Sequence, residues 1–253
     1  MSLAGKRSSL GDEYQLRVAL HWLIRLLEDD TIESIQVNST GIPGEYSSVT
    51  VDDIVVLYKN GHACFIQAKK NQPQHEAWSF SDAELKKELC KARDQLESRE
   101  NSEVRFYSRS PFSELKKLVE DCGYFPEYSA FHRYASKNQL ESLEKLAKIL
   151  ERSEEITYSL VRKISFGSTH EFDDWDRQNL LDLERLIPKA DLAKPILERY
   201  LQSHETHLRD TKYIITQSDV LAELARHGLS PTSKRTEAEI LAEFKQASSI
   251  GRK

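Results

Sequence analysis

The sequence has little of several residue types that mark particular protein classes. Only seven of its 253 residues are proline and nine are glycine, which excludes collagen-like and low-complexity chains and predicts long regular elements. Cys64, Cys90 and Cys122 are widely spaced and form no Cys-x-x-Cys pair, so we expect neither a disulfide framework nor a zinc site. The apolar stretch His21–Leu27 is too short to span a membrane.

The chain also lacks an excess of positive charge. Its net charge is −5, so the general basic footprint of a nucleic-acid-binding protein is absent. A local basic groove remains compatible with this balance, because acidic residues elsewhere can mask it. Basic residues do gather in one part of the sequence, at Lys69, Lys70, Lys86, Lys87, Lys91 and Arg93. Residues 1–11 are polar and basic without the apolar core of a signal peptide, and we therefore expect a cytoplasmic protein.

The most informative segment runs from Val51 to Lys70. Residues 51–58 are rich in β-branched side chains, Asn60-Gly61 is a strong hairpin-turn signal, and residues 63–69 resume the strand pattern. Because side chains alternate along a strand, Gln67 and Lys69 are expected on one face. Asp53 stands near the start of the first strand. An acid, an amide and an ammonium placed together are typical of a metal and phosphate site.

The flanking segments predict an α/β domain. Apolar residues at helical spacing predict a helix over about 10–28, and residues 32–37 predict a strand. A second helix is expected from Ser81-Asp82 with a buried stripe of Leu85, Leu89, Ala92 and Leu96. Its opposite face carries Lys86, Lys87 and Arg93, which we interpret either as a solvated face or as one that lines DNA. A strand over 104–108 and a helix opened by Ser110-Pro111 complete the pattern.

The combination of Asp53 with Gln67-x-Lys69 on the next strand resembles the active-site signature of the PD-(D/E)XK, or restriction-endonuclease-like, nucleases. The Gln variant is similar to that of Mrr-type enzymes. Together with Gly11-x-x-Tyr14-Gln15, the segment looks most like the double-stranded DNA endonuclease domain at the front of antiphage effectors. In CBASS effectors that domain precedes a SAVED sensor domain, and in AVAST effectors it precedes a STAND NTPase. The resemblance covers about residues 10–120 and implies a restriction-endonuclease-like core, a mixed sheet flanked by helices.

The resemblance implies a Mg²⁺-dependent endonuclease, with Mn²⁺ able to substitute. Asp53 is then the main anionic metal ligand, and the Gln67 amide and the Ala68 backbone carbonyl supply neutral oxygens. Lys69 orients or helps to deprotonate the attacking water and stabilises charge on the phosphate. Gln67 stands where most relatives have an acid, so a two-metal site and tight metal binding are disfavoured.

Three further residues are candidates of lower rank. Gln15 matches a position where Mrr-like proteins usually carry Glu, and we group it with the catalytic candidates. Glu45 is a possible additional carboxylate for the metal. Asp52 is expected to point away from Asp53 and to have a supporting role.

The second half of the sequence has mainly helical patterns. We expect residues 1–125 to form the nuclease core and residues 126–253 to form a helical subdomain, which includes a last helix over 236–248. The expected partners are double-stranded DNA, further copies of the chain, and a sensor or NTPase domain in cis or as a separate activator. No phosphate-binding Gly-x-x-x-x-Gly-Lys-Ser/Thr loop occurs in this sequence. Cutting is expected to be switched on by oligomerisation.

Two other interpretations stay open. One is a catalytically inactive module that keeps the fold to bind nucleic acid or a partner. Gln67 and the acidic net charge favour this interpretation. The other is a nuclease for RNA or for modified DNA. Asp53 and Lys69 together argue against the inactive module.

Overall fold

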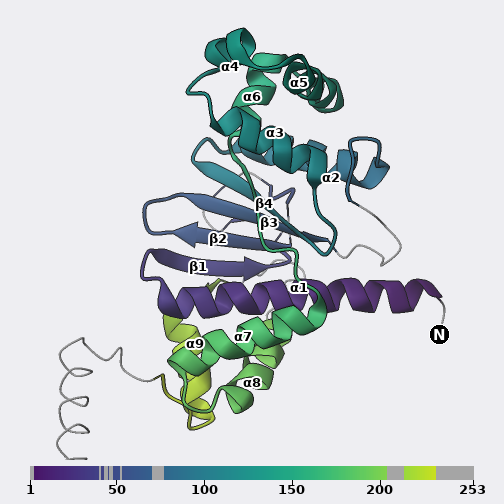
Figure 1. Ribbon diagram of the computed structural model, residues 1–253. Helices are drawn as coiled ribbons and strands as arrows, with labels where there is room; N and C mark the ends of the chain where they lie inside the picture. Colours follow the sequence, from purple (N-terminus) through teal and green to yellow (C-terminus); the bar gives the residue numbers. More distant parts are fainter. Residues whose placement is uncertain are drawn as a thin grey trace, which may run out of the picture.

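The protein has one mixed β-sheet with helices on both faces, as the computed structural model shows (Figure 1). The structure describes residues 3–39, 41–42, 45, 48–51, 53–69, 77–203 and 214–231, and their side chains from residue 13 onward. The sheet order is β5-β4-β3-β2-β1-β6. The strands are β1 (Ile32–Val37), β2 (Ile54–Tyr58), β3 (Ala63–Lys69), β4 (Ser102–Ser108), β5 (Ile164–Phe166) and β6 (Ile215–Thr216).

The type of strand pairing changes from antiparallel to parallel at β3. The β6-β1, β1-β2 and β2-β3 pairs are antiparallel, whereas β3-β4 and β4-β5 are parallel. The parallel β3-β4 pair requires a crossover connection, and helix α2 (Ala83–Ser98) supplies it. This arrangement confirms the predicted α/β class with a mixed central sheet.

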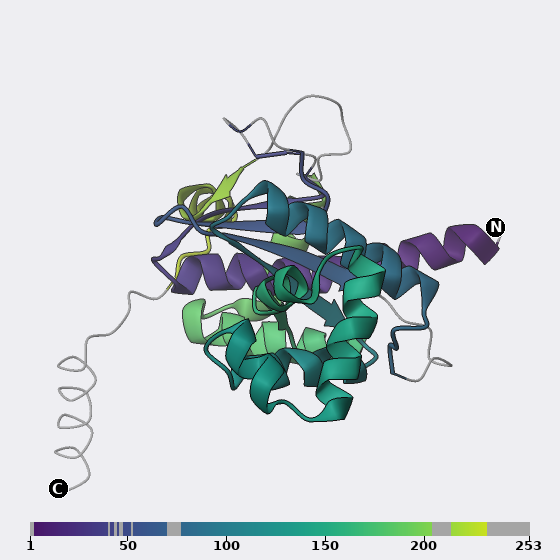
Figure 2. The ribbon, with the colours of Figure 1, turned by 90° about the horizontal axis from the view of Figure 1, so that it is seen from above.

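The remaining helices divide between the two faces of the sheet (Figures 1 and 2). One face is covered by α1 (Leu3–Glu28), α7 (Phe172–Leu186), α8 (Ala190–Ser203) and α9 (Gln217–Arg226). The other face is covered by α2, α3 (Ser113–Gly123), α4 (Tyr128–Tyr134), α5 (Lys137–Leu150) and α6 (Glu154–Val161). A separate apolar cluster lies in each layer.

The hairpin predicted between residues 51 and 70 is present. Ile54 pairs with Ile66, and the turn places Gly61 at φ +78°, a backbone conformation that glycine adopts without the steric cost of a side chain. The first strand of this hairpin, β2, starts later than the sequence pattern indicates. It begins at Ile54 and not at Val51. Beside the start of β2, the backbone N–H of Ala68 on β3 donates to the Asp53 side chain and not to a backbone carbonyl of β2.

Alternation along β3 separates its side chains as expected. Cys64, Ile66 and Ala68 belong to the apolar cluster on the α1 side, and Phe65 belongs to the cluster on the α2 side. Gln67 shares the parity of Phe65 and therefore lies on the α2 side, as does Lys69.

The expected division at residue 125 does not match the layout of the core. β5 and β6 come from the second half of the chain and pair with β4 and β1. Trp175 on α7 and Leu197 on α8 are buried in the same cluster as Leu23 on α1. Residues 126–231 thus supply strands as well as helices, and they contribute to both layers. The helix α1 packs against α7, α8 and α9, which all come from the second half of the chain.

The predicted stripe on α2 is confirmed, since Leu85, Leu89, Ala92 and Leu96 are all buried. The predicted last helix and Asp52 lie outside the described residues. Within the described chain, no helix combines the length and apolarity needed to cross a membrane.

Candidate active site

Asp53 is fixed by hydrogen bonds to both its side chain and its backbone. Its carboxylate Oδ2 accepts hydrogen bonds from the Gln67 side-chain amide and from the backbone N–H of Ala68, the latter at 2.7 Å. Its backbone carbonyl accepts from the backbone N–H of Asn38 at 2.9 Å. The carboxylate therefore has a defined position at the end of β3, where the strand carries Gln67 and Lys69.

The Gln67 side chain is buried, with 1% of its surface exposed. Its amide nitrogen faces Asp53, and its buried Oε1 has no hydrogen-bond partner. A buried amide oxygen without a partner is costly and rare in a folded protein.

Lys69 makes an ion pair with Glu88, a residue of α2 that the sequence analysis did not single out. The Lys69 ammonium lies 3.1 Å from Glu88 Oε1, and the second oxygen of that carboxylate lies 3.4 Å from the ammonium of Lys91. Burial lowers the pKa of Lys69, but the Glu88 and Asp53 carboxylates outweigh this effect and hold the pKa above its usual value. Lys69 is accordingly a permanent ammonium at neutral pH, which suits charge stabilisation better than proton abstraction.

Gln15 approaches Asp53 from the opposite face of the sheet. Its amide nitrogen donates to the backbone carbonyl of Asp53 at 3.2 Å and to Asn38 Oδ1 at 2.6 Å. Asn38 itself has a left-handed backbone, with φ +51°. The structure thus brings Gln15 to the main chain of Asp53 and not to its carboxylate, which makes Gln15 a support for the strand end.

Glu45 lies elsewhere. Its carboxylate pairs with the Arg99 guanidinium, which also donates to the carbonyl of Gly61 at 2.8 Å. Gly61 is in the β2-β3 turn, at the opposite end of the hairpin from Asp53. The structure therefore does not bring Glu45 together with Asp53 and Gln67. The sequence did not determine where Glu45 lies relative to Asp53, because its partner Arg99 is 54 residues away in the chain. The described segment just before Asp53 is likewise held by a distant element, α2.

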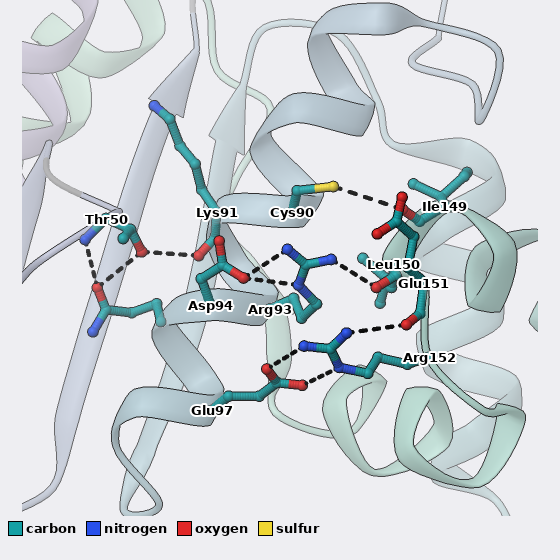
Figure 3. Close-up of polar contacts among 11 residues, drawn as sticks. Thr50, Cys90, Lys91, Arg93, Asp94, Glu97, Ile149, Leu150, Glu151 and Arg152 are labelled. Carbon is teal, nitrogen blue, oxygen red and sulfur yellow. Dashed lines mark hydrogen bonds and ion pairs between the residues drawn. The ribbon is translucent and has the colours of Figure 1, made fainter.

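One such contact anchors the segment just before Asp53. The backbone N–H of Thr50 donates to Gln95 Oε1 at 2.8 Å, and the Thr50 hydroxyl donates to the backbone carbonyl of Lys91 at 2.9 Å (Figure 3). Gln95 is 1% exposed. A single face of α2, with Glu88, Lys91 and Gln95, thus holds Lys69 on one strand and the approach to Asp53 on the other.

Another face of α2 packs against the end of α5. The Arg93 guanidinium donates to the carbonyl of Leu150 at 2.7 Å, the Cys90 thiol lies 3.6 Å from the carbonyl of Ile149, and Arg152 pairs with Glu97 (Figure 3). These carbonyls belong to the last turn of a helix, which carries partial negative charge. Arg93 is therefore an intramolecular cap, so neither earlier interpretation of its face applies to it. Lys86 and Lys87 are exposed.

Asp53, Gln67 and Ala68 can be compared with the needs of Mg²⁺. A carboxylate and a buried, unbonded amide oxygen fit one hard cation that keeps most of its water shell. The described residues contain no group of three or more His, Cys, Asp or Glu side chains arranged to hold a metal. The donors Asp53, Gln67 and Ala68 therefore fit a single weakly held ion and do not fit a two-metal centre.

Sequence reasoning missed Glu88 and Gln95, although the sequence holds a signal for both. They occupy positions between the apolar residues of the α2 stripe, one step from Leu89 and Leu96, and are separated by seven residues. Two polar residues repeated on a buried helix face indicate a specific partner. The identity of that partner is a tertiary fact.

Comparisons with known proteins show likeness in structure only. No protein-family description matches the sequence, and no curated protein matches it. Two similar solved structures are the Acinetobacter baumannii Cap4 SAVED/CARF-domain containing receptor with the cyclic trinucleotide 3′3′3′-cAAA and with 2′3′3′-cAAA. Their TM-scores are 0.53 and 0.52, at 12% and 11% identity. A third is the Moraxella osloensis Cap4 SAVED/CARF-domain containing receptor, with a TM-score of 0.51 at 14% identity.

The extent of the match matters for its meaning. It covers 84–85% of this chain but only 44–46% of each receptor, so this chain spans less than half the length of the proteins it resembles. At such low identity the likeness establishes a shared α/β fold.

Proposed function

We propose that this chain is a metal-dependent endonuclease domain that hydrolyses phosphodiester bonds of double-stranded DNA in antiphage defence. The observation that carries the proposal is the convergence of Asp53, Gln67 and Lys69 on one face at the end of β3. Their order and strand context are those of the PD-(D/E)XK signature, and the sheet that carries them is mixed. The resemblance to Cap4 receptors supports the defence setting.

The side chains have distinct roles in this proposal. Asp53, with Gln67 and the Ala68 carbonyl, would hold one Mg²⁺, which supplies charge neutralisation and an activated water when bound. Lys69 places a permanent ammonium beside the reacting phosphate and stabilises the negative charge that grows in the transition state. Glu88 keeps this ammonium in place. Gln15 and Asn38 fix the main chain of Asp53.

The proposed setting is a longer assembly. The similar receptors are more than twice the length of the matched region, which is in keeping with a nuclease domain coupled to a sensor or NTPase unit in cis or in a separate activator. Oligomerisation is the proposed switch, because an unrestrained nuclease would damage host DNA.

A second candidate function is recognition of a cyclic oligonucleotide. It is favoured by one observation, namely that two of the similar structures are receptors with cyclic tri-adenylates. This function needs neither a metal nor the placement of Asp53 and Lys69 at one strand end. Calorimetric titration with 3′3′3′-cAAA in the presence of EDTA tests it directly.

A plasmid-nicking assay tests the main proposal. Supercoiled plasmid is incubated with Mg²⁺ or Mn²⁺ at several protein concentrations, beside an EDTA control, a Lys69→Ala variant and a Lys137→Ala variant. Lys137 is the control, since it is a lysine at the start of α5 whose side chain is 88% exposed and pairs only with Glu141 among the described residues. We expect metal-dependent nicking that is lost only in Lys69→Ala and that rises steeply with protein concentration.

Other outcomes separate the alternatives. Cleavage of RNA or of methylated DNA in place of the plasmid would redirect the substrate class. Absence of cutting together with absence of metal binding would contradict the nuclease and favour an inactive binding module. Equal nicking by the wild type and Lys69→Ala would contradict the assigned site.

A further inference from the structure

Glu88 lies between two lysines at the candidate site. Its side chain is 5% exposed, whereas the side chains of Lys69 and Lys91 are 25% and 31% exposed. The buried carboxylate therefore sits behind two ammonium groups that reach solvent. Each ammonium is within 3.4 Å of the same carboxylate.

A purely structural ion pair does not explain both lysines. One ammonium balances the charge of Glu88. The Asp53 carboxylate also acts on Lys69, but the proposed function assigns it to the metal, and Glu84 is exposed and has a smaller effect. Among the carboxylates that act on Lys69, none that is buried is then left to balance the charge of the second ammonium. Moreover, Glu88 Oε2 has no hydrogen-bond partner, although Lys91 is in ion-pair range. Lys91 thus adds charge without completing the hydrogen bonding of the carboxylate. An anion in front of the two lysines would balance this charge.

The backbone of Lys91 is tied to the segment that leads to Asp53. Its backbone carbonyl accepts the Thr50 hydroxyl hydrogen bond, and Thr50 is three residues before Asp53 in the chain. The Lys91 side chain extends away from the α5 contacts that Cys90 and Arg93 make (Figure 3). Lys91 therefore belongs to the site side of α2 and not to its packing side.

We propose that Lys91 is a second phosphate-binding residue of the site, paired with Lys69, and that Glu88 is the positioning residue that holds both ammonium groups. The ligand is a phosphodiester group of the nucleic acid. This inference rests on the proposed nuclease function for its ligand, and it adds a substrate-binding residue to it. Each phosphodiester carries one negative charge, which matches the one positive charge that the two lysines keep beyond Glu88 when Asp53 binds the metal.

The binding experiment uses the full chain and a fluorescein-labelled DNA duplex, with EDTA present so that nothing is cut. Anisotropy titrations over a range of salt concentrations compare the wild type with Lys91→Ala, Lys91→Arg and the exposed control Lys137→Ala. Loss of one phosphate contact lowers the slope of log K against log salt by about 0.9 and the affinity by about tenfold near 50 mM salt. We expect this loss in Lys91→Ala alone, with Lys91→Arg close to the wild type.

The kinetic experiment separates binding from positioning. Lys91→Ala is expected to raise KM for plasmid with kcat little changed. Glu88→Gln releases both ammonium groups, so it is expected to raise KM and also to lower kcat. Thermal unfolding of each variant shows whether it is folded, and the Lys91 variants keep the proposal testable if Glu88→Gln does not fold.

The outcomes for this inference and for the nuclease differ. If the wild type binds and cuts DNA but Lys91→Ala behaves like Lys137→Ala, the inference is overturned and the nuclease stands. If the wild type binds 3′3′3′-cAAA but not DNA, and Lys91→Ala loses that binding, the lysine pair holds a phosphodiester of the sensor type and the nuclease fails. Binding of neither ligand overturns both.

Discussion

The carboxylate of Asp53 accepts a hydrogen bond from the backbone N–H of Ala68 at 2.7 Å. A candidate metal ligand thus also satisfies a backbone donor at the end of the β2-β3 pairing. Asp53→Ala would leave this N–H, on a residue that is 7% exposed, without a partner. Asp53→Asn keeps an acceptor oxygen but removes the charge.

We therefore expect Asp53→Ala to lower the free energy of unfolding by about 1–3 kcal/mol, and Asp53→Asn to lower it by less. Both variants should lose metal-dependent nicking. Urea unfolding and the plasmid assay measure the two effects separately. Full nicking by a folded Asp53→Asn protein would contradict the role of Asp53 as the anionic ligand.

Gln95 should matter for activity although it touches no candidate catalytic side chain. Its Oε1 accepts the Thr50 N–H, and its removal in Gln95→Ala leaves that donor unpaired and frees the segment before Asp53. We expect a loss of about 1–3 kcal/mol in unfolding free energy, together with slower nicking by the protein that remains folded. Lys137→Ala, an exposed change at the start of α5, serves as the control. A destabilised Gln95→Ala protein with an unchanged nicking rate would show that the anchor has no part in the site.

The two arginines between α2 and α5 offer a contrast in stability. Arg93 is 14% exposed and donates to the last turn of α5, so Arg93→Ala leaves the buried Leu150 carbonyl with one donor fewer. Arg152 pairs with Glu97 at the surface, where both side chains are about one third exposed.

We expect Arg93→Ala to cost about 1–2 kcal/mol and Arg152→Ala to cost less than about 1 kcal/mol. Guanidinium unfolding of the two variants, side by side, provides the measurement. Equal losses would mean that the helix-end contact is worth no more than a surface pair. Neither change should affect nicking at temperatures well below unfolding.

The pH dependence of stability should carry a contribution from His21. Its ring packs against Trp22 and Trp175, and its Nδ1 is buried without a hydrogen-bond partner. Burial, which is the largest cause, lowers the pKa of His21 to about 4. The nearby charges act in both directions, Asp182 raising the pKa and Arg25, Arg105 and His170 lowering it.

A lowered pKa means that the unfolded chain binds the proton more tightly than the folded one. His21 therefore does not affect stability above about pH 6.5, and it destabilises the fold progressively as the pH falls toward 4, by no more than about 3 kcal/mol. We expect His21→Leu to flatten the loss of stability between pH 6.5 and 4. His132 is exposed, and His132→Gln is the control. Parallel curves of unfolding free energy against pH for the wild type and His21→Leu would contradict the assignment of this effect to His21.

The sequence by itself determined the local features of this protein. Asn60-Gly61 specifies the hairpin turn, the period-2 pattern of residues 63–69 places Gln67 and Lys69 on one face, and the 3.6-residue spacing of Leu85, Leu89, Ala92 and Leu96 defines the buried stripe of α2. These features depend on residues that are close together in the sequence, so a single sequence is enough to predict them.

The tertiary structure alone decided which distant residues meet. Glu88 reaches Lys69 across 19 positions of sequence, Glu45 turns to Arg99 instead of Asp53, and Gln15 reaches Asp53 from the other face of the sheet. The division expected at residue 125 missed the strands that later residues add to the sheet. Charge pairing and burial are set by packing between elements far apart in the chain, and no local pattern encodes which partner a buried charge will find.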